Sequence, residues 1–131
     1  MEKTGTQTEI RDYKDLVVWQ KGMQLAKQVY QLTQSFPTEE KFGLVSQMRR
    51  AAVSVPSNVA EGQARNTTGE FVQFVSHAEG SLAELDTQLR LSVELGFCRE
   101  PAVTSVQDLV IEEQKMLKSL RRSLKGARTY P

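Results

Sequence analysis

Few side chains in this sequence could carry out catalysis. His77 is the only histidine and Cys98 the only cysteine among 131 residues. A metal site built from several histidines or cysteines is therefore excluded, and no serine, histidine and aspartate occur with a recognisable catalytic spacing. The glycines are scattered and form no phosphate-binding loop. We predict that the protein is not an enzyme and that it uses no metal or other cofactor.

Basic residues concentrate near the C-terminal end of the chain. They are Lys115, Lys118, Arg121, Arg122, Lys125 and Arg128, and no acidic residue follows Glu113. On a helix of about 100° per residue these side chains fall on one side. One interpretation is a solvated face that interacts favourably with the C-terminal end of the helix dipole. The other is a positive band that contacts nucleic-acid phosphates irrespective of sequence, to which Arg49 and Arg50 would add.

The stretch SVPSNVAEG, which contains Pro56, is the most unusual local motif. In a structural interpretation, Asn58 and the serines satisfy backbone groups that Pro56 leaves without a partner, while Glu61 pairs with Arg65 on the next turn. In a functional interpretation, a polar groove at a subunit boundary is formed by Arg50, Asn58, Glu61 and Arg65. That groove would accept a phosphate or a polar group of a partner.

Apolar residues also lie outside the expected core faces. Val53, Ala60 and Ala64 form a strip of small side chains beside the core face of one helix, and Leu91 and Leu95 lie off the main apolar face of another. Surplus apolar surface on two helices of a small bundle indicates association with copies of the same chain. We therefore predict a homo-oligomer that uses these five residues.

Four helices are needed to position these groups. Apolar residues recur every three or four positions in four segments, which we expect at about residues 12–36, 38–65, 67–96 and 101–126. Short connections between long helices favour an antiparallel up-down four-helix bundle. We predict one bundle domain at residues 12–126, a flexible N-terminal tail at 1–11 and a C-terminal tail at 127–131.

The second segment has the clearest amphipathic pattern. Its expected core face holds Val45, Met48, Ala52, Val55, Val59 and Gly62. Pro56 lies in the same segment and lacks the N–H that would bond the carbonyl of Ala52, which costs an isolated helix about 3 kcal/mol. We expect a kink at Pro56.

Two other helical positions stand out. Gly80 has no side chain, so we expect a neighbouring helix to approach closely there. Glu113 is the one polar residue in the apolar seam of the last segment, between Val110 and Leu117.

Composition limits the classes of partner. Lys and Arg number 17 against 16 for Asp and Glu, so the net charge of +1 indicates no particular ligand. The charge is segregated, because residues 67–100 are acidic overall and residues 101–131 basic overall. A single cysteine excludes an intrachain disulfide, and no apolar run approaches the ~18 residues that a membrane span needs. We expect a cytoplasmic protein without a membrane partner.

Six stretches of the sequence match motifs of a known family. They occur in order as DLVVWQK (15–21), FP (36–37), FGL (42–44), QMRRAA (47–52), SVPSNVAEG (54–62) and GSLAEL (80–85). In these stretches the chain resembles the four-helix-bundle proteins encoded in intervening sequences of bacterial large-subunit ribosomal RNA genes. That family is related to accessory proteins of diversity-generating retroelements. One departure is Gly22, where alanine is common in the family.

The resemblance implies an assembly and a set of partners. Family members form ring-like or barrel-like homopentamers with a central channel, and retroelement relatives associate with reverse transcriptase. We accordingly predict a scaffold whose subunits display repeated positive bands to structured RNA or to RNA–DNA hybrids. The alternative is a protein-assembly module whose basic residues keep it soluble. Its partner binding, through Leu91, Leu95 and the strip of small residues, would be insensitive to salt.

Overall fold

The computed structural model describes residues 12–129, and within them the chain forms helices and no strand. The four long helices are α1 (Val17–Thr33), α2 (Leu44–Gln63), α3 (Thr68–Glu94) and α4 (Glu100–Thr129). The short 3-10 helices η2 (Tyr13–Asp15) and η3 (Thr38–Glu40) precede α1 and α2. The predicted all-α class with four long helices is therefore confirmed.

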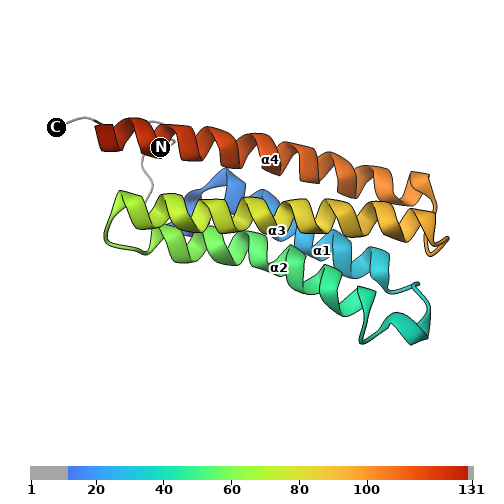
Figure 1. Cartoon of the computed structure of the whole chain (residues 1–131). Coiled ribbons are helices and arrows are strands. Elements are labelled where there is room, and N and C mark those ends of the chain that lie inside the picture. The colour runs from blue at the N-terminus through green and yellow to red at the C-terminus, as the bar shows by residue number, and fades with distance from the viewer. Residues whose placement is uncertain (1–11, 130–131) are drawn as a thin grey trace, which may run out of the picture.

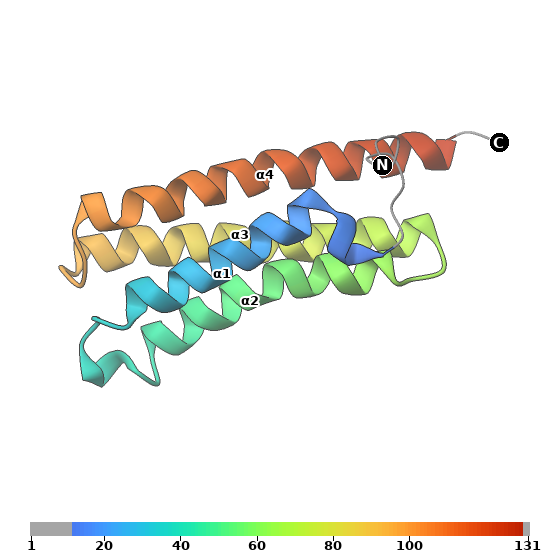
Figure 2. The ribbon, with the colours of Figure 1, turned by 180° about the vertical axis from the view of Figure 1, so that it is seen from behind.

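The helices pack side by side around one core. α1 packs on α2 and α4, and α3 packs on α2 and α4. The α1–α2 and α3–α4 connections lie at one end of the molecule and the α2–α3 connection at the other (Figure 1). Seen from behind, α1 lies between α4 and α2 (Figure 2). This arrangement leaves one outward face on each helix, and these faces carry the candidate sites.

Helix ends follow local capping, although several lie away from the expected positions. Asp12 caps η2 and not α1, because its carboxylate accepts from the N–H of Lys14. α2 begins at Leu44, later than expected, and its first N–H donates to the side chain of Glu40 at 3.2 Å. Thr67 caps α3, since its hydroxyl accepts from the N–H of Glu70 at 3.1 Å.

The C-terminal parts of the chain also differ in detail from expectation. Gly96, with φ of +78°, follows the end of α3 as predicted, and the next N–H bonds back to the carbonyl of Ser92 at 2.9 Å. α4 continues to Thr129, three residues past the expected end at Gly126. Part of the segment predicted as a C-terminal tail is therefore helical. The predicted N-terminal tail, residues 1–11, lies outside the described residues.

The predicted core face of α2 is buried. Its six residues, Val45, Met48, Ala52, Val55, Val59 and Gly62, are all buried. The helix is continuous through Pro56, which is itself buried. The bend that we expect at this proline stays a prediction.

The glycine that permits close packing is not the one that we expected. Gly80 is exposed, and no atom lies within 4 Å of the position of an added Cβ. At Gly62 an added Cβ would lie 2.8 Å from Cδ1 of Phe71 and 2.8 Å from Cβ of Phe74. Because Gly62 faces α3 and Gly80 faces outward, α2 and not α3 supplies the glycine at this contact.

α1 has two apolar faces, of which one forms the core. Leu25 and Val29 are fully buried, whereas Met23 and Tyr30 on the neighbouring face are exposed. The apolar arc of α1 is thus wider than the bundle uses. Among the described residues, none of the helices has the length and the apolar character that crossing a membrane requires.

Candidate nucleic-acid interface

Four basic side chains form one exposed stripe along the C-terminal half of α4. Lys115, Lys118, Arg122 and Lys125 are all exposed, and their spacing of three, four and three residues places them on one face. Within residues 12–126 none of them makes an ion pair. We call these four residues the α4 basic band. The side chain of Arg128, which the sequence also assigned to it, lies outside the described residues.

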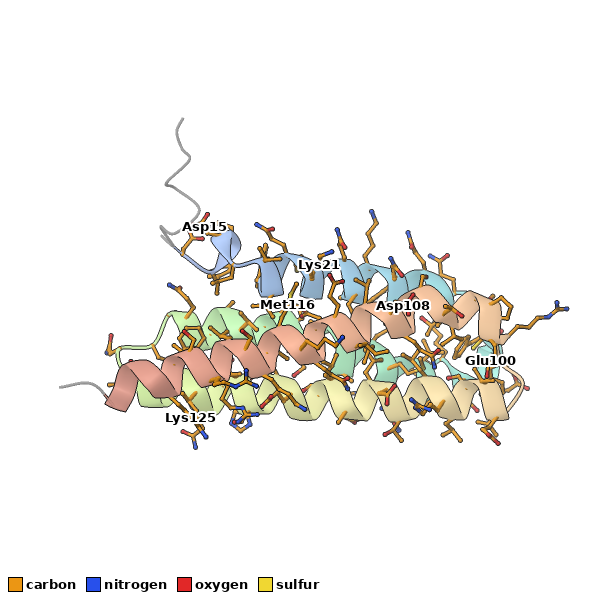
Figure 3. All side chains as sticks on the ribbon, turned by 90° about the horizontal axis from the view of Figure 1, so that it is seen from above. Asp15, Lys21, Glu100, Asp108, Met116 and Lys125 are labelled. Atoms are coloured by element: carbon orange, nitrogen blue, oxygen red, sulfur yellow. The ribbon has the colours of Figure 1, made fainter. Side chains whose placement is uncertain are left out.

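Charge is unevenly distributed along α4. Glu100 is the first residue of the helix, whereas Lys125 lies near its C-terminal end (Figure 3). Both ends therefore carry the charge that the helix dipole favours. This is the stabilising effect that the first interpretation of the basic run requires, and it leaves the exposed lysine and arginine heads available to a ligand.

Arg121 does not belong to the basic band. Its guanidinium donates from Nε to Oε1 of Glu79 at 3.0 Å and from Nη2 to Oε2 at 3.2 Å. The pair connects α4 to α3 with two parallel hydrogen bonds, and both side chains are partly buried. A phosphate would have to displace a carboxylate that is already held in the matching geometry. The sequence could not indicate this, because Glu79 lies 42 residues away.

Arg49 and Arg50 have different environments although they are adjacent in sequence. Arg49 lies between α1 and α2, where its Nε donates to Oγ1 of Thr33 at 2.9 Å and its Nη2 to the carbonyl of Tyr30 at 3.3 Å. Arg50 is exposed and makes one hydrogen bond, from Nη2 to the hydroxyl of Ser46 on the preceding turn. Arg50 can therefore contact a ligand with most of its guanidinium, and Arg49 with only part of its own.

The polar residues around Pro56 bond mainly to each other. The amide of Asn58 donates to both the carbonyl and the hydroxyl oxygen of Ser54, each at 2.8 Å. The hydroxyl of Ser54 also bonds that of Ser81 on α3, at 2.8 Å. Glu61 lies 3.9 Å from Arg65, as the structural interpretation predicted. These contacts support a structural role for Asn58, which holds the hydroxyl of Ser54 where that hydroxyl joins α2 to α3. The carbonyl that Asn58 bonds is that of Ser54, and not that of Ala52, which Pro56 leaves without its helical donor.

The residues assigned to self-association are exposed to different extents. Val53 is 41% exposed, Leu91 45% and Leu95 53%, whereas Ala60 is only half-buried and Ala64 is exposed. The apolar surface is larger than expected, because Met23, Tyr30 and Phe42 are also exposed. Met23 and Tyr30 belong to the exposed apolar face of α1. Homo-oligomer formation itself stays a prediction.

Glu113 is completely buried in the bundle. Neither of its carboxylate oxygens has a hydrogen-bond partner within the described residues. Burial raises the pKa of Glu113 to about 8; neighbouring Glu112 raises it further, whereas Lys21 opposes this shift. Lys21 itself pairs with Glu112 at 3.4 Å, on the edge of α1 that faces α4 (Figure 3). The carboxyl of Glu113 is therefore protonated at neutral pH.

Gly22 makes the space that Glu113 occupies. An added Cβ at Gly22 would lie 3.0 Å from Oε2 of Glu113 and 3.3 Å from Cβ of Pro56. The absence of a side chain at Gly22 lets α1, α2 and α4 meet around one carboxyl group. A protonated carboxyl enclosed in this way has no access to a substrate.

The other titratable candidates give no catalytic arrangement. His77 is exposed and its ring contacts the edge of Phe74. Burial raises the pKa of the Cys98 thiol, which disfavours the reactive thiolate. In the described part of the chain, no three His, Cys, Asp or Glu side chains gather in a group that could hold a metal ion.

Comparison with protein families gives a match that covers residues 14–119. The family is described as 23S rRNA-intervening sequence protein. The matched region contains α1, α2 and α3 and ends ten residues before the end of α4. Lys115 and Lys118 of the α4 basic band lie within it, and Arg122 and Lys125 lie beyond it. Comparison with curated proteins gives no match.

Proposed function

Because this chain belongs to the family of 23S rRNA-intervening sequence proteins, we propose that it is a non-enzymatic scaffold that binds structured RNA or an RNA–DNA hybrid. The α4 basic band is the proposed contact surface. The observation that carries the proposal is the set of four exposed cations on one face of α4, none of which forms an ion pair within the described residues. Cations of this kind bind phosphates by releasing counterions, which gives affinity without sequence preference.

The proposed assembly is a homo-oligomer of antiparallel up-down bundles, and the family resemblance favours a ring of five subunits. The exposed apolar residues Val53, Leu91 and Leu95 support an interface between copies. Val53 lies on α2, Leu91 on α3 and Leu95 directly after α3. In the proposed ring the α2 surface of one copy contacts the α3 surface of the next, and a contact between unlike surfaces generates a ring when the rotation closes. A ring repeats the α4 basic band in every subunit and so raises avidity for a long nucleic acid. Reverse transcriptase is the protein partner that the resemblance adds.

A salt series tests the proposed contact surface. We would change Lys115, Lys118, Arg122 and Lys125 to Glu and measure fluorescence anisotropy of a labelled RNA hairpin. The wild-type affinity should fall steeply with salt, and the log–log slope should shrink by about 0.9 for each phosphate that the variant no longer binds. The matched control changes four other basic residues to Glu, with an equal change in net charge, at Lys14, Lys27, Arg90 and Arg99. Equal weakening in the two variants, or no binding of RNA or DNA by the wild type at low salt, would refute the proposal.

A protein-assembly module is the second candidate function. The exposed side chains of Leu91 and Leu95 favour this function, because apolar side chains contribute nothing to the binding of phosphates. In that case partner binding would survive high salt and would be abolished when Leu91 is changed to Glu. The hairpin experiment separates the two functions, since an assembly module would show no salt-dependent RNA affinity.

A further inference from the structure

A surface groove of about 620 Å³ lies beside α2, near the connection from α1. Its lining combines aromatic, apolar and basic side chains, which include Tyr30, Lys41, Phe42, Arg49, Arg50 and Val53. We call this surface the basic–aromatic groove. The α1–α2 connection lies at the opposite end of the bundle from the C-terminal end of α4 (Figure 1). The groove is therefore separate from the α4 basic band.

Phe42 is the most exposed large apolar side chain in the described residues, at 89%. The ammonium group of Lys41 lies 5.6 Å from the centre of its ring. The two residues are neighbours in the short segment between η3 and α2, so the ring and the cation are presented together. An aromatic ring this exposed contributes little to the fold, and it offers a planar surface to a ligand.

Arg49 and Tyr30 form a second, preorganised pair in the same groove. The guanidinium of Arg49 lies 4.4 Å from the centre of the Tyr30 ring. Its position is fixed by hydrogen bonds to the hydroxyl of Thr33 and to the carbonyl of Tyr30. A planar group stacked and held in this way loses little conformational freedom when a ligand binds.

The charge of the groove selects an anionic ligand. Lys41, Arg49 and Arg50 line it, and no carboxylate is among its lining residues. A neighbouring hollow of about 410 Å³ shares Phe42 and Arg50 but has Glu84 on its wall. A negative group is thus favoured on the α1 side of Arg50 and disfavoured on the α3 side.

We propose that the basic–aromatic groove binds an unpaired nucleotide of an RNA strand, with its base against Phe42 and its phosphate against Lys41 and Arg50. A nucleotide has a flat base, which can stack on an aromatic ring of the groove, and an anionic phosphate, which can bind the cations of the groove. Base–aromatic stacking beside cations is the means by which proteins hold single strands. The proposal rests on the proposed function only in taking the ligand to be RNA. The α4 basic band would contact backbone phosphates, and the groove would recognise a nucleotide that is not paired.

The test compares an unstructured 12-nucleotide RNA with a blunt 12-base-pair duplex. Phe42→Ala should weaken binding of the single strand by about 5- to 100-fold, the effect expected of one stacked base, with an unchanged salt slope. Binding of the duplex should change by less than about twofold, because its bases are already stacked. Arg50→Gln should weaken single-strand binding and reduce the log–log salt slope by about 0.7. Phe42→Leu, which keeps an apolar side chain but no ring, should resemble Phe42→Ala.

Matched controls exist for both changes. Ile111→Ala removes an exposed apolar side chain on α4, and Arg99→Gln removes an exposed cation before α4, both outside the groove. Neither should alter single-strand affinity by more than about twofold. Circular dichroism of each variant would verify that the helices are intact, and sedimentation velocity would give its mass.

Several results would overturn the proposal. Equal weakening of single-strand and duplex binding in Phe42→Ala would remove the role of stacking. Adenosine monophosphate that bound as tightly as the strand would make the ligand a free nucleotide. A lower mass of Phe42→Ala would make the occupant a second copy of this chain. The variant of the α4 basic band separates the two proposals. If it loses duplex binding and keeps single-strand binding, the result supports the basic–aromatic groove independently of the α4 basic band.

Discussion

At the scale of single residues, the structure distinguishes cations that are free to bind from cations that are not. Arg121 and Arg122 are adjacent, yet Arg121 pairs with Glu79 through two hydrogen bonds and Arg122 is exposed. Arg49 and Arg50 differ in the same way, since Arg49 is held against Tyr30. A count of basic residues therefore overstates the surface that a phosphate can reach.

Glu113 predicts a pH dependence of stability. Its pKa is about 8 in the folded protein against an ordinary value of 4.5, so the folded state holds the proton more tightly than the unfolded state. The stabilisation is complete below about pH 4.5 and is lost as the pH rises through about 8, with a total on the order of 3–5 kcal/mol. Glu113→Gln keeps the shape and cannot ionise. We expect the variant to unfold with similar free energy to the wild type at pH 5 and to be several kcal/mol more stable at pH 9.

Urea unfolding at pH 5, 7 and 9 would measure this difference. Other titrating groups occur in both proteins, so their effects cancel when the two profiles are subtracted. Asp108→Asn is the control, because Asp108 is exposed on α4 and its removal leaves both the buried carboxyl and the Lys21–Glu112 pair in place. Parallel pH profiles for the wild type and Glu113→Gln would show that Glu113 is not a buried neutral acid.

At the scale of helices, contacts between elements decide which small residues matter. Gly62 and Gly80 are both inside long helices, where glycine costs about 0.5–1 kcal/mol relative to alanine. Only Gly62 faces another helix, with Phe71 and Phe74 of α3 on its Cβ side. The helical period places a residue on a face, but the partner on that face comes from the packing.

Two glycine substitutions should have opposite effects on stability. Gly62→Ala places a methyl group 2.8 Å from carbon atoms of two phenylalanines, so we expect a decrease of about 1–3 kcal/mol in the free energy of unfolding. Gly80→Ala places it in open space and should raise that free energy by about 0.5–1 kcal/mol. Thermal unfolding followed by circular dichroism would measure both. A stabilised Gly62→Ala would mean that α2 and α3 pack less closely at this position.

At the scale of the whole molecule, the proposed ring depends on exposed apolar residues of different helices. Val53 belongs to α2, Leu91 belongs to α3 and Leu95 directly follows α3. All three are too exposed to contribute much to the core. Their contribution to stability is therefore small in a single subunit and larger when a second copy covers them.

Charged substitutions at these positions should dissociate the oligomer. Val53→Glu and Leu91→Glu each bury a carboxylate in the proposed interface, which should yield monomers by light scattering while the helical content is retained. Ala60→Glu should act in the same direction, although Ala60 is partly covered within the subunit. The control is Ile111→Glu, because Ile111 is an exposed apolar residue of α4 and lies outside the proposed contact surfaces on α2 and α3. An unchanged mass in Val53→Glu and Leu91→Glu would exclude these surfaces from the assembly.

The sequence by itself determined the helical class, the family and the core face of α2, because these follow from local periodicity and from motifs read along the chain. It located the end of the third helix near Gly96 for the same reason. Only the tertiary structure decided which helix covers Gly62, which arginine Glu79 neutralises and that Phe42 joins Tyr30 in one groove. These features depend on residues far apart in sequence, whose contacts are set by how the helices pack and by no pattern within one helix.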